Sequence, residues 1–306
     1  MQRHDPLPSW RPGSTRDALE AFLAAAEEVP VVDRVAYFDN DGTLWCERPS
    51  YVQLDFFVDA LRKHVAEDPS IGERAEFAAL LSVDQAAIAG IGLQRIALAL
   101  AGLFEGMTPE EFASAVREFM AGATHPTLGR PTRSVTYQPM SELIAELRHR
   151  DFTVGIVTGG GTEFVRAISD DLYGVPAELV VGTLIGYDVS RDGEGPPVIR
   201  RTSGLLGVAN EGSAKVANIQ TQLGRRPILA AGNSGGDREM LEWAQAAGSP
   251  SLALLIDHDD AAREFHYPST AQTFAETEPI TDVGARLGWT VVSMARDWDI
   301  VFPPVS

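Results

Sequence analysis

The sequence predicts an α/β protein with a mainly parallel sheet, helices on both faces of that sheet, and a mainly helical segment inserted after the first strand. Short apolar runs typical of buried strands alternate with helical patterns over most of the chain. Residues 47–125 depart from this alternation, because apolar residues keep helical spacing there without a convincing strand. Glycine-rich polar turns follow three of the strands, at the edge where α/β sheets bind their ligands.

The N-terminal part of the chain is expected to lead into the first strand through one helix. Residues 1–13, rich in proline and charge, are expected to be a loose arm. Residues 14–29 show an apolar stripe at helical spacing, and Ser14 with Asp17 resembles a capping box at its start. The apolar run of residues 35–38 then predicts a buried strand.

The inserted segment is expected to be a domain of its own. Thr108 followed by Pro109 is a strong helix start within it. A helical insertion between the first and second strands is well placed to act as a lid over a site at the sheet edge. We therefore expect a helical cap of residues 47–125 and a discontinuous α/β core of residues 14–46 and 126–295.

Regular alternation of strands and helices resumes after Pro139. Repeated strand–helix units predict a parallel sheet, because right-handed crossovers place consecutive strands side by side. The expected elements are a helix at 141–150, a strand at 152–157, a helix at 163–172, a hairpin of 179–189 and 197–201, a helix at 214–223, a strand at 228–231, a helix at 238–247, a strand at 252–256 and an edge strand at 290–293.

Composition excludes several classes of function. The formal charge of −18 argues against a nucleic acid or an anionic membrane as partner, since both require a basic face. Neither a signal-peptide core nor an 18-residue apolar run occurs, so a cytoplasmic protein is expected. The single cysteine, Cys46, excludes an internal disulfide and a multi-cysteine metal site. We expect Cys46 to fill space near the candidate site rather than to act as a nucleophile.

The first motif is a pair of carboxylates, Asp39 and Asp41, directly after the first strand. Because the backbone curls where a strand ends, both side chains can point into one crevice, one as nucleophile and the other as proton donor or acceptor. A plain Asp-Gly turn without a catalytic role is the alternative interpretation of the same sequence. A calcium-binding EF-hand loop is excluded, since its glycine comes sixth and Gly42 is fourth, while Ser50 occupies the place of the bidentate acid.

The second motif is Thr158-Gly159-Gly160 at the end of the next predicted strand. A hydroxyl followed by glycines lets backbone N–H groups approach an anion closely. The dinucleotide-binding fingerprint fails here because Phe164 stands where its third glycine would be, and no P-loop motif occurs in the chain. An ordinary strand-to-helix turn is the alternative interpretation.

The third motif is a single lysine. Of 25 Lys and Arg residues, only Lys63 and Lys215 are lysines. A compact ammonium can enter a small pocket and contact one phosphate oxygen, whereas the planar guanidinium is larger and prefers bidentate partners. Lys215 could therefore neutralise a phosphate and the charge of a transition state. An exposed helix lysine is the alternative.

The fourth motif, residues 231–237, follows another apolar strand and contains Asn233 and Asp237. Both supply the hard oxygen ligands that Mg²⁺ prefers, and Mg²⁺ needs few protein ligands because it keeps waters. A glycine-rich turn with Asp237 capping the next helix is the alternative, and Asp237 can do this in either case.

Taken together, these motifs resemble those of the haloacid dehalogenase superfamily, and most closely its phosphoserine phosphatase-like branch. The likeness covers about residues 33–257 and rests on Asp39-x-Asp41-Gly42-Thr43, Thr158-Gly159-Gly160, Lys215 and Gly232-Asn233-x-x-x-Asp237. It implies a Rossmann-like core, and the gap between the first two motifs matches the position of a helical cap of the C1 type.

The resemblance also implies a role for each motif residue. Asp39 would attack phosphorus and form an aspartyl-phosphate, and Asp41 would protonate the leaving alcohol and later activate water. Thr158, Gly159, Gly160 and Lys215 would bind the phosphate. Mg²⁺ would be held by the Asp39 carboxylate, the Asp41 carbonyl and Asn233, with Asp237 a ligand or directly behind the ligands. The family usually has Asp where this chain has Asn233, so weaker metal binding is expected.

The expected function is therefore Mg²⁺-dependent hydrolysis of a small phosphorylated metabolite. Two carboxylates would repel a phosphate dianion, so Mg²⁺ and Lys215 are needed to offset them. A phosphotransferase or mutase using the same intermediate is one alternative. A non-catalytic module that binds a phosphorylated ligand is another, although such a module has no use for the acid–base residue Asp41.

Two further groups of residues lie near the predicted site. Asp257-His258-Asp259-Asp260, with His266, is expected to be a solvated loop, and a second metal site is the alternative. Residues just past the first motif could touch substrate, although core packing explains the first of them as well; they are Trp45, Glu47, Arg48 and Tyr51.

Overall fold

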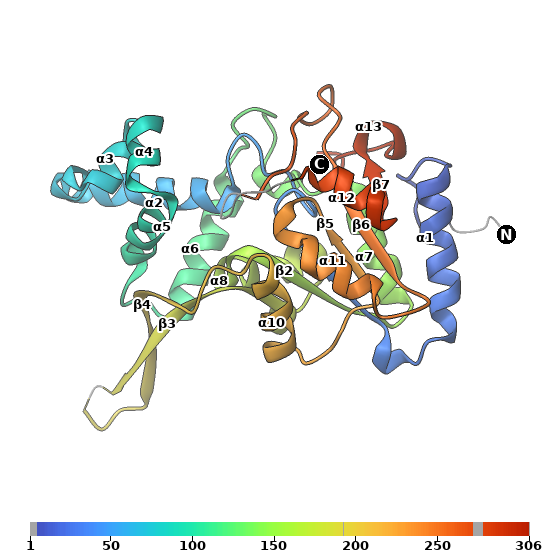
Figure 1. Cartoon of the computed structure of the whole chain (residues 1–306). Helices are drawn as coiled ribbons and strands as arrows, with labels where there is room; N and C mark the ends of the chain where they lie inside the picture. Colours follow the sequence, from blue (N-terminus) through green and yellow to red (C-terminus); the bar gives the residue numbers. More distant parts are fainter. Residues whose placement is uncertain (1–4, 192, 272–277, 306) are drawn as a thin grey trace.

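The protein is built around one mainly parallel β-sheet, shown in Figure 1. The computed structural model describes residues 5–191, 193–271 and 278–305. Within them the strands are β1 (Val35–Phe38), β2 (Thr153–Gly161), β3 (Val180–Arg191), β4 (Pro197–Leu206), β5 (Leu229–Gly232), β6 (Leu252–Asp257) and β7 (Thr290–Ser293). The α-helices are α1 (Ser14–Ala25), α2 (Val52–Glu67), α3 (Ala75–Leu81), α4 (Gln85–Ile91), α5 (Leu93–Ala101), α6 (Pro109–Gly122), α7 (Gln138–His149), α8 (Thr162–Arg166), α9 (Ser169–Tyr173), α10 (Ser213–Gln222), α11 (Arg238–Gln245), α12 (Ile280–Leu287) and α13 (Met294–Asp297).

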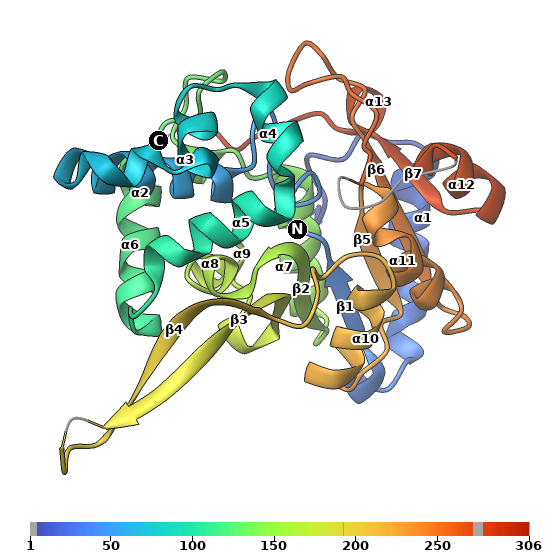
Figure 2. The same ribbon diagram turned by 60° about the vertical axis from the view of Figure 1, so that its left-hand side comes forward.

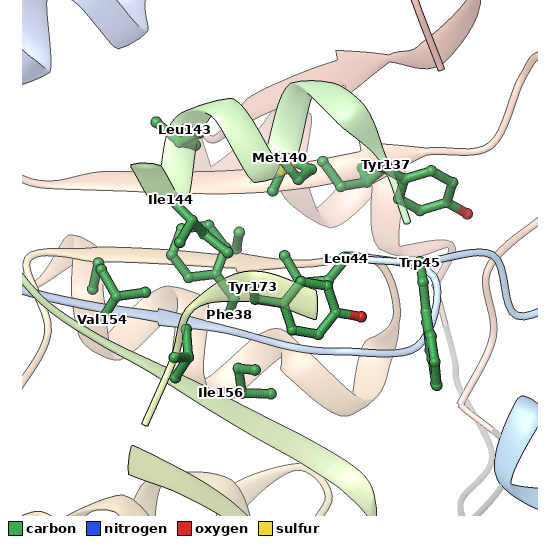
Figure 3. Close-up of a cluster of buried hydrophobic side chains, with 14 of the residues drawn as sticks. Phe38, Leu44, Trp45, Tyr137, Met140, Leu143, Ile144, Val154, Ile156 and Tyr173 are labelled. Atoms are coloured by element: carbon green, nitrogen blue, oxygen red, sulfur yellow. The ribbon is translucent and has the colours of Figure 1, made fainter. Parts of the chain in front are cut away.

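The predicted α/β class with helices on both faces of the sheet is confirmed. Successive side chains of β1 point to opposite faces, as in any strand. Ala36 and Phe38 pack in the cluster that contains the apolar faces of α1 and α7. Val35 and Tyr37 pack on the other face, with α10, α11 and α12. Figure 3 shows the first of these layers, where Met140 and Ile144 of α7 point toward the side of Phe38 in β1.

The strand order places β1 in the middle of the sheet and makes its carboxyl end the centre of the structure. The order is β4-β3-β2-β1-β5-β6-β7, with every neighbouring pair parallel except β3 and β4. The chain therefore extends the sheet in one direction from β1 and then crosses back to add β5 on the other side. Ligand sites of open α/β sheets lie at the carboxyl ends of the strands beside such a reversal.

The prediction of a loose N-terminal arm is wrong for the described residues 5–13. Leu7 and Trp10 are 0% and 1% exposed, and the Trp10 indole N–H donates to the Pro139 carbonyl at 3.0 Å. Trp10 also packs edge-on against Trp298, with ring centroids 5.9 Å apart. Burying two tryptophans removes a large apolar area from water, which offsets the proline-rich composition. The core therefore extends beyond the predicted limits of residues 14 and 295, and residues 1–4 lie outside the described part.

The start and end of the first helix also differ from the prediction. Ser14 is the first residue of α1 rather than its N-cap, which is Gly13, and no side chain caps the helix. A hydroxyl already inside the first turn cannot take the capping position, so the predicted box of Ser14 and Asp17 does not form. The helix ends at Ala25, and a short 3₁₀ turn follows.

The segment between β1 and α7 is mainly helical, as predicted, and carries α2 to α6. Figures 1 and 2 show α2 to α5 on the side of the molecule opposite α1. The predicted helix start at Thr108 is confirmed as a full capping box, with Glu111 as its partner. A small separate cluster of hydrophobic side chains lies inside this segment. Phe56 of α2 belongs to the main core instead, and the centroid of its ring lies 5.6 Å from that of Phe164 in α8. The limits 47 and 125 of a cap domain stay a prediction.

The predicted hairpin is confirmed as β3 and β4, which pair antiparallel and project from the body of the molecule in Figures 1 and 2. Its base rests on the inserted segment, because Arg201 of β4 exchanges backbone hydrogen bonds with Gly106 and Met107 at 2.9 and 2.8 Å. Two neighbouring elements differ from the prediction. Strand β2 continues to Gly161, and the single helix expected at 163–172 is divided into α8 and α9.

In the described part of the chain, no single helix is long and apolar enough to cross a membrane. One pair of helices, 85–91 with 94–104, meets the length and composition criteria only when taken together, and it is bent by 91°.

Candidate active site

All four predicted motifs meet at the carboxyl edge of the central strands. Asp39 follows β1, Thr158 lies in the last part of β2, and Asn233 follows β5. Lys215 comes from the first turn of α10. Because β1 is hydrogen-bonded to both β2 and β5, these residues become neighbours although they are far apart in the sequence.

Lys215 is the centre of a buried ion cluster. Its Nζ donates to Asp39 Oδ1 at 2.6 Å, to Asp237 Oδ1 at 2.5 Å and to the Val157 carbonyl at 3.0 Å. The side chain is 2% exposed, so the alternative of an exposed helix lysine is wrong. Burial by itself would lower the pKa of Lys215, but the charges of Asp237 and Asp39 outweigh it and hold the pKa above its ordinary value.

Asp39 is also buried, at 6% exposure. Burial raises the pKa of its carboxyl well above the ordinary value, and the nearby charge of Asp237 raises it further. The ammonium of Lys215 acts in the opposite direction. A divalent cation at the carboxylate would favour the charged form in the same way as Lys215 does, and more strongly.

Asp41 is held by two donors. The indole N–H of Trp45 donates to Oδ1 at 2.8 Å, and the Thr158 hydroxyl lies 3.5 Å from Oδ2. Burial raises the pKa of the Asp41 carboxyl, and the hydrogen bond from Trp45 opposes this. The buried Trp45 is thus both a core residue and a contact of the site. A carboxyl whose protonated form is favoured is suited to giving a proton.

The turn after Asp41 depends on Gly42. Its φ of +75° lies in the left-handed region that favours glycine. A Cβ at this position would lie 2.0 Å from Asn233 Nδ2 and 2.9 Å from the Glu47 carboxyl carbon. The glycine is therefore required twice, once for the turn and once for the close approach of these two side chains.

The glycines after Thr158 make room for two side chains that sequence reasoning missed. The Gly160 N–H donates to the Thr158 hydroxyl at 2.9 Å, and the Gly161 N–H donates to Gln53 Oε1 at 2.9 Å. A Cβ on Gly159 would lie 2.6 Å from Glu211 Oε1. Gln53 belongs to α2, so the inserted helical segment reaches the glycine-rich strand end directly.

Asp237 organises the turn that carries Asn233. Its Oδ2 accepts the backbone N–H groups of Asn233 and Ser234, both at 3.0 Å, while its Oδ1 accepts from Lys215. Both carboxylate oxygens are therefore engaged. The two predicted options for Asp237, a ligand or a residue directly behind the ligands, stay predictions.

Asn233 is 2% exposed, and its side-chain amide meets Glu47. Asn233 Nδ2 donates to Glu47 Oε1 at 3.2 Å, and the Tyr267 hydroxyl donates to the same oxygen at 2.9 Å. Burial raises the pKa of the Glu47 carboxyl. The guanidinium of Arg48 lies 4.3 Å from the centre of the Tyr267 ring.

The segment after β6 was expected to be solvated, and this is wrong for its central residues. His258 is 0% exposed and Asp260 is 5% exposed. His258 Nε2 lies 2.9 Å from the Gly42 carbonyl and Nδ1 lies 3.2 Å from Glu264 Oε2. Both ring nitrogens are therefore within hydrogen-bond distance of an oxygen atom. Through the contact of His258 with the Gly42 carbonyl, the segment supports the turn after Asp41.

Glu264 connects His258 to other buried side chains of the core. Its Oε1 accepts from the Tyr137 hydroxyl at 3.0 Å and from the Cys46 thiol at 3.1 Å. Burial alone would raise the pKa of Glu264, but the contributions of His258, the Phe265 backbone N–H and the Cys46 thiol together outweigh it, and the pKa lies below its ordinary value. Cys46 itself is buried, and burial raises the pKa of its thiol, which confirms a space-filling role over a nucleophilic one.

Replacing His258 by Gln is expected to lower the free energy of unfolding by about 1–3 kcal/mol, because one buried hydrogen bond of the ring cannot be reproduced by an amide. Urea unfolding followed by far-ultraviolet circular dichroism measures it. The control is His149→Gln, on an exposed position at the end of α7, with an expected change within about 0.5 kcal/mol. Equal effects of the two substitutions would show that His258 does not support the turn.

The donor set fits Mg²⁺ better than it fits a transition metal. Among the described residues, no group of three or more His, Cys, Asp or Glu side chains could hold a metal ion, so a second metal site at Asp257–Asp260 is not found. The predicted site uses other donors, namely one carboxylate, one backbone carbonyl and one amide oxygen, which is the all-oxygen set that Mg²⁺ accepts together with water. The carboxylates of Asp39 and Asp237 both contact the single ammonium of Lys215, whose charge also acts on the nearby Asp41 carboxyl, so a further cation would offset the excess of negative charge.

Comparison with known proteins agrees with this architecture. A family model described as haloacid dehalogenase-like hydrolase matches residues 36–242. A solved structure of a protein with unknown function from Bordetella pertussis Tohama I is 18% identical, with a TM-score of 0.50, over 85% of this chain and 97% of that one. At this identity the likeness shows a shared fold.

Two further solved structures have lower TM-scores. A HAD family hydrolase from Salmonella enterica serovar Typhi is 13% identical with a TM-score of 0.40, covering 78% of this chain and 67% of that one. A phosphoserine phosphohydrolase-like protein from Francisella tularensis is 14% identical with a TM-score of 0.39, covering 83% of this chain and 99% of that one. No match was found among curated proteins.

Proposed function

Because the chain belongs to the haloacid dehalogenase-like hydrolase family, we propose that it is a Mg²⁺-dependent phosphatase that hydrolyses a small phosphomonoester through an aspartyl-phosphate on Asp39. The observation that carries the proposal is the pair of carboxyl groups at one sheet edge. Asp39 is ion-paired to Lys215 at 2.6 Å, and Asp41 is held by Trp45 and Thr158. One group is thus prepared to attack and the other to exchange a proton.

The proposed first step forms one bond and breaks one. A carboxylate oxygen of Asp39 attacks phosphorus in line with the ester oxygen, so that an acyl-phosphate bond forms as the ester P–O bond breaks. The Asp41 carboxyl gives its proton to the departing alkoxide, which leaves as the alcohol. The ammonium of Lys215 offsets the charge of the phosphoryl oxygens, and the Thr158 hydroxyl and the Gly159 backbone N–H hold them.

The second step reverses the role of Asp41. Its carboxylate takes a proton from water, the water oxygen attacks phosphorus, and the acyl-phosphate bond to Asp39 breaks. Inorganic phosphate leaves and both carboxyl groups return to their starting state. Mg²⁺ would be held by the Asp39 carboxylate, the Asp41 carbonyl and the Asn233 amide oxygen, and it would supply charge that offsets the carboxylate–phosphate repulsion.

We further propose that residues 47–125 act as a cap over this site. Gln53 supports the proposal, because it belongs to the inserted segment and accepts a hydrogen bond from Gly161 at 2.9 Å. A cap that contacts the phosphate-binding strand end can exclude water when substrate is bound. A small phosphorylated metabolite in the cytoplasm is the proposed substrate class.

A screen of the purified protein with Mg²⁺ against a panel of phosphorylated metabolites tests the function. Release of inorganic phosphate from at least one of them is expected, with none in the presence of excess chelator. Added alcohols separate the two enzymatic alternatives, because a phosphotransferase or mutase would pass the phosphoryl group to the alcohol. Tight binding of a phosphorylated ligand without any turnover would instead identify a non-catalytic module.

Asp41→Asn is expected to slow hydrolysis of alkyl phosphates by about 10²–10⁴-fold, because their alkoxide needs a proton to leave. Aryl phosphates with activated leaving groups need no such proton, so their first step should be slowed much less. The rate of alcohol release measured by rapid mixing gives this first step for both substrate classes. Equal slowing of both would remove Asp41 from the acid role.

A further inference from the structure

The side chain of Asn233 can serve a cation with only one of its two ends. The amide oxygen is a ligand for Mg²⁺, whereas the amide nitrogen carries two protons and repels it. The group that binds the amide nitrogen therefore decides whether the amide oxygen faces the site. In the structure that group is Glu47, whose Oε1 lies 3.2 Å from Asn233 Nδ2.

Glu47 is itself fixed as an acceptor. Its Oε1 also accepts the hydroxyl proton of Tyr267 at 2.9 Å, and the side chain is 8% exposed. Tyr267 in turn is covered by Arg48 and stacks on the His258 ring, with centroids 4.4 Å apart. An oxygen that accepts from two donors in a packed pocket offers only its lone pairs to the Asn233 amide.

The backbone leaves space for this contact at Gly42. Gly42 passes beside both side chains, and a Cβ there would lie 2.0 Å from Asn233 Nδ2. The turn that carries Asp41 therefore packs directly against the pair. The contact joins residues 186 positions apart in the sequence.

We propose that Glu47 is a positioning residue of the Mg²⁺ site, which turns the Asn233 amide so that its oxygen faces the cation. This inference rests on the proposed function, since it assumes that Asn233 is a ligand. The contact keeps the Asn233 amide from turning its nitrogen to the cation, an orientation that would weaken Mg²⁺ binding. A carboxylate at position 233 would need no such partner, because both of its ends are oxygens.

The test compares the same change at position 47 in two backgrounds. Glu47→Leu removes the acceptor, and Glu47→Gln removes the charge but retains an oxygen that can accept. With Asn233 present, the dissociation constant for Mg²⁺ should rise about 10-fold for Leu and less for Gln. With Asn233→Asp present, neither change should raise it. Isothermal calorimetry on the full chain measures the binding without reference to activity.

The metal-free protein gives an independent readout. Asn233→Asp alone places two carboxylates in contact, so its melting temperature should fall by a few degrees. Adding Glu47→Gln to Asn233→Asp should recover most of that loss, because the glutamine amide can donate to the new carboxylate. Glu76→Leu is the control, since Glu76 is 7% exposed and binds Arg95 in the inserted segment. It should leave Mg²⁺ binding unchanged.

Two results would overturn the role of Glu47. One is an unchanged Mg²⁺ dissociation constant for Glu47→Leu in the parent background. The other is equal weakening in the parent and Asn233→Asp backgrounds, which would indicate loss of charge rather than loss of orientation. A parent protein that binds no Mg²⁺ at all would overturn the proposed metal site itself, and the orienting role with it.

Discussion

Asp39→Asn is expected to abolish turnover while the protein stays folded and still binds phosphate. The amide is nearly isosteric with the carboxylate but is a poor nucleophile, so no aspartyl-phosphate can form. Lys215 retains its second partner, Asp237, at 2.5 Å, so the buried ammonium is not left without a counter-charge. Hydrolysis of p-nitrophenyl phosphate with Mg²⁺ measures the activity, and calorimetry with inorganic phosphate measures the binding.

The control is a second buried aspartate in a different part of the core. Asp297 is 7% exposed and binds the Thr15 hydroxyl and the Ser293 backbone N–H, far along the chain from the candidate site. Asp297→Asn should alter stability but leave the activity of the folded protein intact. Mass spectrometry of acid-quenched parent protein should detect a phosphoryl group on Asp39. Substantial activity in Asp39→Asn would place the chemistry on another residue.

The sequence could predict Asp39, Thr158 and Asn233 because each of them lies at or near the end of a strand. An apolar run of four residues before Asp39, and another before Asn233, indicates a buried parallel strand without any knowledge of its neighbours. Once both strands belong to one parallel sheet, their carboxyl ends must lie at one edge. The convergence of Asp39, Thr158 and Asn233 is therefore a consequence of local patterns together with sheet topology.

The contacts that support these residues could not be predicted in the same way. His258 meets the Gly42 carbonyl across 216 positions, and Gln53 meets Gly161 across 108. No periodicity connects such pairs, since each depends on how two loops or a loop and a helix pack. The polar letters around His258 resemble those of a solvated loop. They become a buried network only because Glu264 and Tyr137 supply partners.

The prediction of a loose N-terminal arm was wrong for a related reason. Its proline and charge content matches that of a loose arm, and composition gives no sign of where Trp10 is buried. The partner is Trp298, near the other end of the chain. Two large aromatic side chains that pack together outweigh the unfavourable local composition, and only the tertiary structure reveals the pair.

Lys215→Met is expected to lower the free energy of unfolding by about 3–5 kcal/mol at neutral pH, because it leaves two buried carboxylates without their cation. Asp39 Oδ1 and Asp237 Oδ1 lie 2.6 and 2.5 Å from Nζ, and both residues are at most 6% exposed. Methionine is close to lysine in shape, so the loss reports the charge rather than a cavity. Urea unfolding of the metal-free protein measures it.

The loss should depend on pH with a definite sign. Burial already holds the pKa of Asp39 above its unfolded value, and removing Lys215 removes the charge that opposes this shift. A group with a raised folded pKa stabilises the fold below its unfolded pKa and loses that contribution as the pH rises through the folded pKa. Lys215→Met should therefore be less destabilising at pH 5 than at pH 8.

The only other lysine in the chain provides the matched control. Lys63 is exposed and pairs with Asp59 one helical turn away at 2.9 Å, so Lys63→Met should change stability by no more than about 0.5 kcal/mol at either pH. If Lys215→Met behaves like Lys63→Met, the ion cluster does not stabilise the fold. A large loss that is the same at pH 5 and pH 8 would point to packing instead. Only a large loss that shrinks on acidification agrees with a lysine whose charge holds two carboxylates together at the centre of the site.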